Sequence, residues 1–130
     1  MSGPLLDRID LHVDVPAVPV DAINHAPAGE GSAAIRARVE QAQVFRRERG
    51  QACPNGRLRP REVAAHCRMT PPAAQLLTAA LTELHLSARS YTKIVTVART
   101  IGDLAGHETI RPDDVAEAIQ YRSLDRQWWG

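Results

Sequence analysis

The chain's longest apolar stripe lies in the sequence SARSYTKIVTVARTIGDLAG, which is residues 87–106. Its apolar side chains recur every three or four positions, as they do on one face of an α-helix: Tyr91, Ile94, Val95, Ala98, Ile101 and Ala105. Ser87 is a typical helix N-cap, and Gly106 is a typical residue at a helix end. The sequence therefore predicts a helix between these two residues with its stripe, Tyr91 included, in the core.

Two further helices are predicted on the N-terminal side by the same signals. Ser32 is expected to cap the first, which Gly50 ends, and its apolar side consists of Ile35, Val39, Ala42 and Phe45. Pro60 is well placed in the first turn of a second, short helix that turns three residues inward: Val63, Ala64 and Cys67.

Proline also opens the two remaining helices. Thr70 and Pro71 begin one that runs to about Leu84, with a stripe of Leu76, Leu77, Ala80, Leu81 and Leu84. Pro112 begins the last helix. Asp113 and Asp114 lie in its first turn, where the helix dipole favours acidic side chains, and three residues are expected to face inward: Val115, Ala118 and Ile119. The predicted fold is mainly α, a bundle of four or five helices over residues 32–122.

The N-terminal part of the chain has a different period. Residues 9–15 alternate strictly between apolar and polar side chains, which predicts a β-strand with one buried face. A single strand leaves its backbone groups without neighbours, so it belongs either to a sheet cut away upstream or to a pairing with another copy of the chain. The expected organisation is a strand over 1–16, a linker over 17–31, the helical domain over 32–122 and a tail over 123–130.

Length and composition fit one small soluble domain. The 130 residues are 44% apolar and 24% charged, with a net charge of +1. No apolar run approaches the roughly 18–20 residues of a membrane span, and the N-terminus does not resemble a signal peptide. Cys53 and Cys67 form no disulfide framework, and together with His66 they lack the spacing of a zinc site, so no metal is expected. The cytoplasm is the expected location.

Charge is unevenly distributed along the chain. Residues 1–30 carry one basic and five acidic residues (−4), residues 31–68 nine and three (+6), and residues 69–130 six and seven (−1). Six arginines of the middle third are candidates for contact with nucleic acid or with an acidic subunit surface: Arg46, Arg47, Arg49, Arg57, Arg59 and Arg61. The alternative is that this basic stretch is a solvated helix face. No aromatic residues are interleaved with these arginines, so base stacking has little support.

Four sequence blocks together resemble a known family. They are SGPLLDRIDLHV at 2–13, LSARSY at 86–91, VARTI followed by DLAG at 97–106, and AEAIQYR at 116–122. In this order they are similar to the C-terminal end of the magnesium-chelatase-like AAA+ ATPases of the ComM or YifB group. The resemblance implies that the strand is the last of the ATPase core's sheet and that the helices form the lid over the nucleotide.

The same resemblance implies roles for two arginines. Arg89 matches the sensor-2 arginine. A cation in the first turn of a helix is unfavourable by roughly 0.3–1 kcal/mol, because it meets the positive end of the helix dipole. An anion beside it, such as a phosphate, makes the position favourable. Arg8 matches the arginine finger presented to the nucleotide of a neighbouring subunit. The plainer interpretations are a solvent-exposed Arg89 and a surface pair of Arg8 with Asp7 or Asp10.

The resemblance also implies a ring motor with ATP and magnesium, partnered by its own core and by neighbouring subunits. ComM-type members are regarded as hexameric DNA helicases in natural transformation, and other relatives form the ATPase subunit of magnesium chelatase. This chain has no phosphate-binding loop, so the isolated fragment is expected neither to hydrolyse ATP nor to hold a cofactor. The alternative function is a stand-alone helical module that binds nucleic acid or protein through residues 36–68.

Overall fold

The computed structural model describes residues 8–25 and 27–122 and is mainly helical within them. Five α-helices lie between residues 32 and 120, which confirms the predicted bundle. The elements in order are α2 (Val20–His25), α3 (Ser32–Glu48), the 3₁₀ helix η1 (Asn55–Arg57), α4 (Pro60–His66), α5 (Pro71–Glu83), α6 (Ala88–Ala105) and α7 (Pro112–Gln120).

Helix α6 forms where the sequence predicted a helix, and it is the centre of the bundle. The Ser87 hydroxyl accepts a hydrogen bond from the Ser90 amide, and Gly106 ends the helix in the left-handed conformation at φ 80°. The helix contacts α3, η1, α4 and α7, while α5 packs on α7. The core comprises Leu58, Val63, Cys67, Ala73, Leu77, Ile94, Val95, Ala98, Ile110, Val115 and Ala118. Tyr91 and Leu76, expected in the core, are 38% and 37% exposed, and Ala105 of the same predicted stripe as Tyr91 is exposed as well. Leu76 lies at the edge of its stripe, whereas Tyr91 and Ala105 lie at the two ends of α6.

A buried polar network ties α3, η1 and α6 together around Asp103, which is 3% exposed. The Arg49 guanidinium donates to both Asp103 carboxylate oxygens, at 2.6 and 2.9 Å. Arg99 Nε lies 3.2 Å from Asp103 Oδ1. Burial lowers the pKa of Arg99, and the charge of Asp103 acts in the opposite direction. The Asn55 side chain also donates to Asp103, at 3.2 Å.

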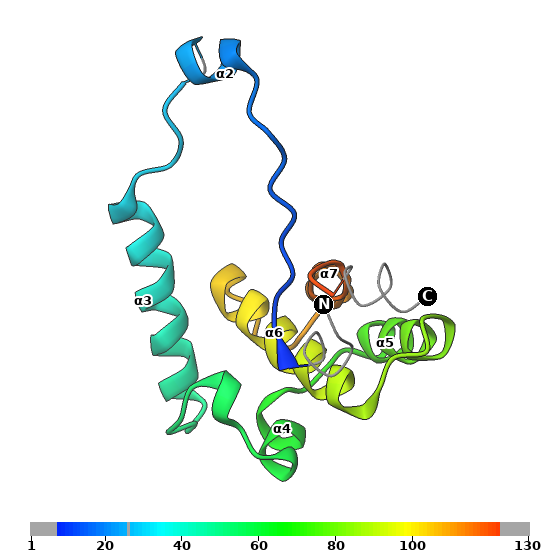
Figure 1. The fold of residues 1–130 in the computed structure, drawn as a ribbon. Coiled ribbons are helices and arrows are strands. Elements are labelled where there is room, and N and C mark those ends of the chain that lie inside the picture. Colours follow the sequence, from blue (N-terminus) through cyan, green and yellow to red (C-terminus); the bar gives the residue numbers. More distant parts are fainter. Residues whose placement is uncertain (1–7, 26, 123–130) are drawn as a thin grey trace.

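The first half of α3 differs from its prediction. Gly31 occupies the N-cap position, and Ser32 is the first helical residue. Of the predicted apolar side, Ala42 is buried, whereas Ile35 and Val39 are 44% and 46% exposed. Figure 1 shows the reason, because the segment that contains α2 and the start of α3 form an arch that rises away from α4–α7.

The predicted strand over residues 9–15 does not form among the described residues. The segment is irregular, with no neighbouring strand to pair with, and a strand requires such a ladder. The expected burial is also reversed, since His12 is 4% exposed while Val13 and Val15 are 61% and 80% exposed. The segment expected as a linker, 17–31, contains the short helix α2. The tail 123–130, with Trp128 and Trp129, lies outside the described residues.

Within the described ranges, no helix combines the length and the apolar character needed to cross a bilayer.

The buried thiol of Cys67 generates a pH-dependent prediction. Burial raises its pKa from 9.0 to about 11. The folded protein therefore keeps this proton to higher pH than the unfolded chain does, so the free energy of unfolding should fall as pH rises through this window. We expect a loss of roughly 2 kcal/mol between pH 9 and 11, measured by urea unfolding.

Matched variants isolate the thiol from other groups that titrate at alkaline pH. Cys67→Ala should remove this part of the pH dependence, whereas Cys53→Ala should retain it. Equal alkaline losses in all three proteins would show that Cys67 ionises alike in the folded and unfolded states.

Candidate anion-binding site

The two arginines singled out by the sequence lie at one cavity. Its volume is about 370 Å³, within the range of small-molecule sites. The lining residues are Arg8, Asp10, Gly56, Leu58, Arg89, Thr92, Lys93 and Thr96. Residues from the N-terminal segment, the η1 region and the first turns of α6 therefore meet at a single position.

Helical periodicity explains the contribution of α6. Arg89, Lys93 and Thr96 are separated by four and then three residues, so they project from one face of the helix. This face is opposite to the stripe that packs in the core. The sequence motifs pointed to Arg89 and not to Lys93, although Lys93 lies one helical turn after Arg89.

The charges at the cavity favour an anion. Lys93 forms an ion pair with Asp10, the single carboxylate of the lining, so the charges of these two residues cancel. No hydrogen bond or ion pair joins Arg8 or Arg89 to another described residue, and both are exposed. The hydroxyls of Thr92 and Thr96 donate to carbonyls of their own helix. The groups left to meet a ligand are thus two guanidiniums, which are suited to the oxygens of a phosphate.

The basic middle of the chain divides into structural and exposed arginines. Arg49 binds Asp103, and Arg46 donates to the carbonyl of Ala52 at 2.9 Å. Arg47 is exposed. The remaining three arginines line a separate hollow of about 410 Å³ with Ala52, Cys53 and Glu62: Arg57, Arg59 and Arg61.

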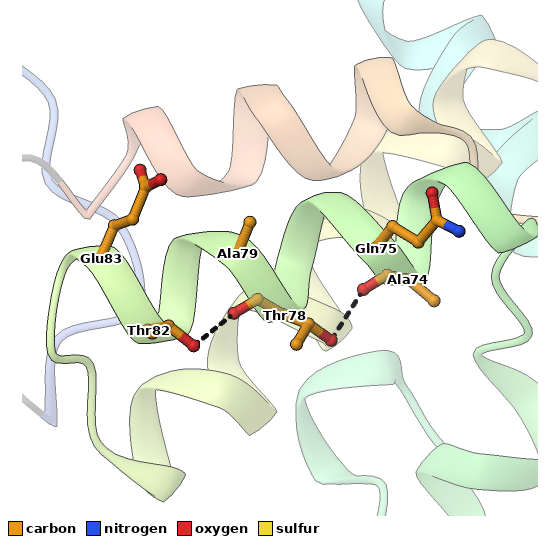
Figure 2. A pocket seen from close by; sticks show the side chains of 6 residues that line it. All are labelled: Ala74, Gln75, Thr78, Ala79, Thr82 and Glu83. Atoms are coloured by element: carbon orange, nitrogen blue, oxygen red, sulfur yellow. Dashed lines mark hydrogen bonds between the residues drawn. The ribbon is translucent and has the colours of Figure 1, made fainter.

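A third hollow lies on the outer face of α5 and is poorly suited to an anion. Figure 2 shows its lining, Ala74, Gln75, Thr78, Ala79, Thr82 and Glu83, all from one helix. Thr78 and Thr82 donate to the carbonyls of Ala74 and Thr78, as the dashed lines show, so their hydroxyl protons point inward. The one charged group, Glu83, would repel an anion.

The cysteines lie apart from any cluster of metal-binding side chains. Cys53 is half-buried and Cys67 is buried, and both are free thiols. In the part of the chain that the structure describes, no three His, Cys, Asp or Glu side chains gather as a metal site would require.

Comparison with known proteins identifies the family. The family described as "Magnesium chelatase, subunit ChlI C-terminal" matches residues 29–122. The chain belongs to this family. It is 38% identical over 127 residues to the competence protein ComM of Haemophilus influenzae, covering 97% of this chain and 25% of the relative. Proteins called YifB in Salmonella typhimurium and Escherichia coli are 38% and 34% identical, with the same coverage.

These matches show the C-terminal region of the magnesium-chelatase-like ComM/YifB group, as the sequence blocks indicated. The helical part corresponds to the lid domain of a magnesium-chelatase-like AAA+ protein. The chain spans about a quarter of the length of the curated relatives it matches. Two blocks that carry the resemblance shape α6, since Arg99 and Asp103 of the buried network come from the third and the capping Ser87 from the second.

The division of the arginines predicts opposite effects on stability. Arg49→Ala removes the bidentate partner of the buried Asp103 carboxylate, which should lower the free energy of unfolding by about 2 to 4 kcal/mol. Arg47→Ala, the matched control two residues earlier in the last turn of α3, should change it by no more than about 0.5 kcal/mol. Urea unfolding of both variants checks this, and equal stabilities would mean that the Arg49 pair contributes nothing.

Proposed function

We propose that this domain is the nucleotide-sensing lid of a ring-forming AAA+ ATPase, in which Arg8 and Arg89 together bind the terminal phosphate of ATP. The observation that carries the proposal is the shared cavity with two guanidiniums that no described carboxylate pairs. Placing an anion there would offset the unfavourable position of Arg89 in the first turn of α6. A guanidinium at a transferring phosphoryl group stabilises the charge that develops in the transition state.

The shared cavity further supports action on a single nucleotide. If Arg8 is an arginine finger that acts on the neighbouring subunit, then Arg89 acts on that same neighbouring nucleotide, because both residues line one cavity of one chain. The lid would then report the state of an adjacent subunit's ATP and couple turnover around the ring.

The phosphate-binding loop and the magnesium ligands are proposed to come from the ATPase core, which this chain does not include. Residues 9–15 are proposed to complete that core's sheet as its last strand. The exposed row of Leu11, Val13 and Val15 supports this role, because apolar side chains at alternate positions suit a strand covered on one face. Binding to the core would bury a surface that is otherwise costly to expose.

For the parent protein we propose a ComM-type DNA helicase, and the support from the comparisons is that one relative is named a competence protein. Arg57, Arg59 and Arg61 support contact with the phosphate backbone of DNA, because all three are exposed around one hollow. The alternative partner for this surface is an acidic patch on a neighbouring subunit. The lid of a magnesium-chelatase ATPase subunit is a second candidate that the family description favours.

Mixed rings of the full-length protein test the nucleotide assignment. One subunit type carries an inactivated phosphate-binding loop and intact arginines, and the other carries Arg8→Ala. We expect each type alone to lose ATP turnover, on the order of 10³-fold for Arg8→Ala, and the mixture to recover part of it. Arg89→Ala should behave as Arg8→Ala does. Unchanged ATP affinity and turnover in Arg89→Ala would remove the proposal. If mixed rings recover turnover with Arg8→Ala but not with Arg89→Ala, the two arginines do not share one nucleotide.

DNA binding by the full-length protein tests the second surface. The triple variant Arg57→Ala, Arg59→Ala and Arg61→Ala should weaken duplex binding and reduce the slope of log affinity against log salt by roughly 2 to 3. The control removes three exposed arginines elsewhere, Arg36, Arg68 and Arg111, for the same change in net charge. Equal slopes for the two triple variants would argue against DNA contact, and lost ring assembly in the first would indicate the subunit interface.

A further inference from the structure

Arg122, just after the end of α7, bridges the two segments that supply the cavity arginines. Its side chain is buried, with 3% of the residue exposed. Nη1 donates to the carbonyl oxygen of Ile9, and Nη2 donates to the Ser90 hydroxyl at 3.3 Å. One planar guanidinium therefore joins the N-terminal segment to the first turn of α6.

Both acceptors are immediate neighbours of the residues at the cavity. Ile9 follows Arg8 in the chain, and Ser90 follows Arg89. Fixing the Ile9 carbonyl and the Ser90 hydroxyl to one rigid group thus restrains the backbone from which each arginine projects. Arg122 itself does not line the cavity.

Other contacts reinforce the junction between the N-terminal segment and the bundle at Arg122, here called the seam. The His12 amide donates to the carbonyl of Tyr121 at 2.6 Å, so two successive residues after α7 hold the N-terminal segment. Lys93 and Asp10 form an ion pair across the cavity, but the Asp10 side chain is 62% exposed, and exposed pairs contribute little to rigidity. The buried bonds of Arg122 are the stronger restraint, because charged donors in buried sites are costly to leave unpaired.

We propose that Arg122 is a positioning residue that holds Arg8 and Arg89 in register so that both reach one phosphate. The inference rests on the proposed function of the cavity and assigns a role to a residue outside it. The physical reason is geometric, because displacement by about 1 Å far from the chemistry is enough to cost on the order of 10²-fold in rate.

The guanidinium is required for this role, and positive charge alone is insufficient. Arginine presents several donors in a fixed plane and so reaches two acceptors at a set separation, whereas the lysine ammonium is a point charge on a flexible stem. Lysine at this position would keep the charge and most of the apolar stem while losing the bridge. Arg122→Lys is therefore the informative variant.

The experiment measures ATP turnover by the full-length protein carrying Arg122→Lys, alone and combined with Arg89→Ala. Arg111→Ala, which removes an exposed arginine at the other end of α7, is the control. We expect Arg122→Lys to lower kcat at least 10-fold. We also expect Arg89→Ala to cost several-fold less in the Arg122→Lys background than in the native one, because Arg89 is already displaced from the phosphate.

This second readout separates positioning from a merely structural role. A loss of folded protein would lower the turnover of Arg122→Lys and of the double variant by the same factor. The factor by which Arg89→Ala lowers turnover would then be the same in both backgrounds. If Arg122→Lys does not fold, Ser90→Ala removes one of the two acceptors and should show the same reduced dependence on Arg89. An unchanged kcat in a folded variant, or an equal Arg89→Ala loss in both backgrounds, would overturn the role of Arg122.

The outcomes also distinguish this inference from the function on which it rests. If Arg8→Ala and Arg89→Ala reduce turnover while Arg122→Lys does not, the proposed function stands and the positioning role is refuted. If neither cavity substitution affects turnover, the proposed function fails and the positioning role fails with it.

Discussion

The carboxylate of Asp103 is the group on which the packing of this domain depends. It is buried, and its negative charge offsets that of two arginines from different parts of the chain, Arg49 after α3 and Arg99 within α6. Arg99 also donates to the carbonyls of His107 and Glu108, at 2.6 and 3.1 Å, in the turn that leads to α7. Removing this carboxylate would leave two arginines without their shared counter-ion, so these elements are held together as a unit. Gly102 fits the same constraint, because a Cβ there would lie 3.1 Å from Arg99 Nη2 and 3.2 Å from Asp114 Oδ2.

This arrangement gives the two ends of α6 different roles. Near its C-terminus the arginine and the aspartate are paired inside the bundle. Near its N-terminus Arg89 is exposed at a cavity, together with Arg8 from a distant segment. A rigid helix fixed at one end by buried charges is a suitable support for a cation that must meet a ligand, since catalytic and binding groups require supported positions. The seam at Arg122 completes that support by tying the N-terminal segment to the same helix.

The helical part of the fold could be predicted well because its signals are local. Caps at Thr70 and Ser87 and the left-handed Gly106 act within one turn of the chain, and the structure contains each of them. The strand over 9–15 could not be judged in this way, since a strand needs a neighbour and the alternation alone does not supply one. Ile35 and Val39 were expected to be buried and are exposed for a similar reason, because periodicity defines an apolar side but does not show what covers it.

At the site, Arg8 and Arg89 were found through their sequence blocks, but their meeting at one cavity depends on the tertiary structure. So does the separation of Arg49, which is paired, from Arg57, Arg59 and Arg61, which are exposed.

The most direct measurement is an experimental structure of the full-length protein with magnesium and a non-hydrolysable ATP analogue. The account predicts that the guanidiniums of Arg8 and Arg89 from one chain lie within hydrogen-bond distance of the same terminal phosphate, with Arg122 still bound to the Ile9 carbonyl and the Ser90 hydroxyl. Contacts of the two arginines with different nucleotides, or a terminal phosphate that neither reaches, would contradict it.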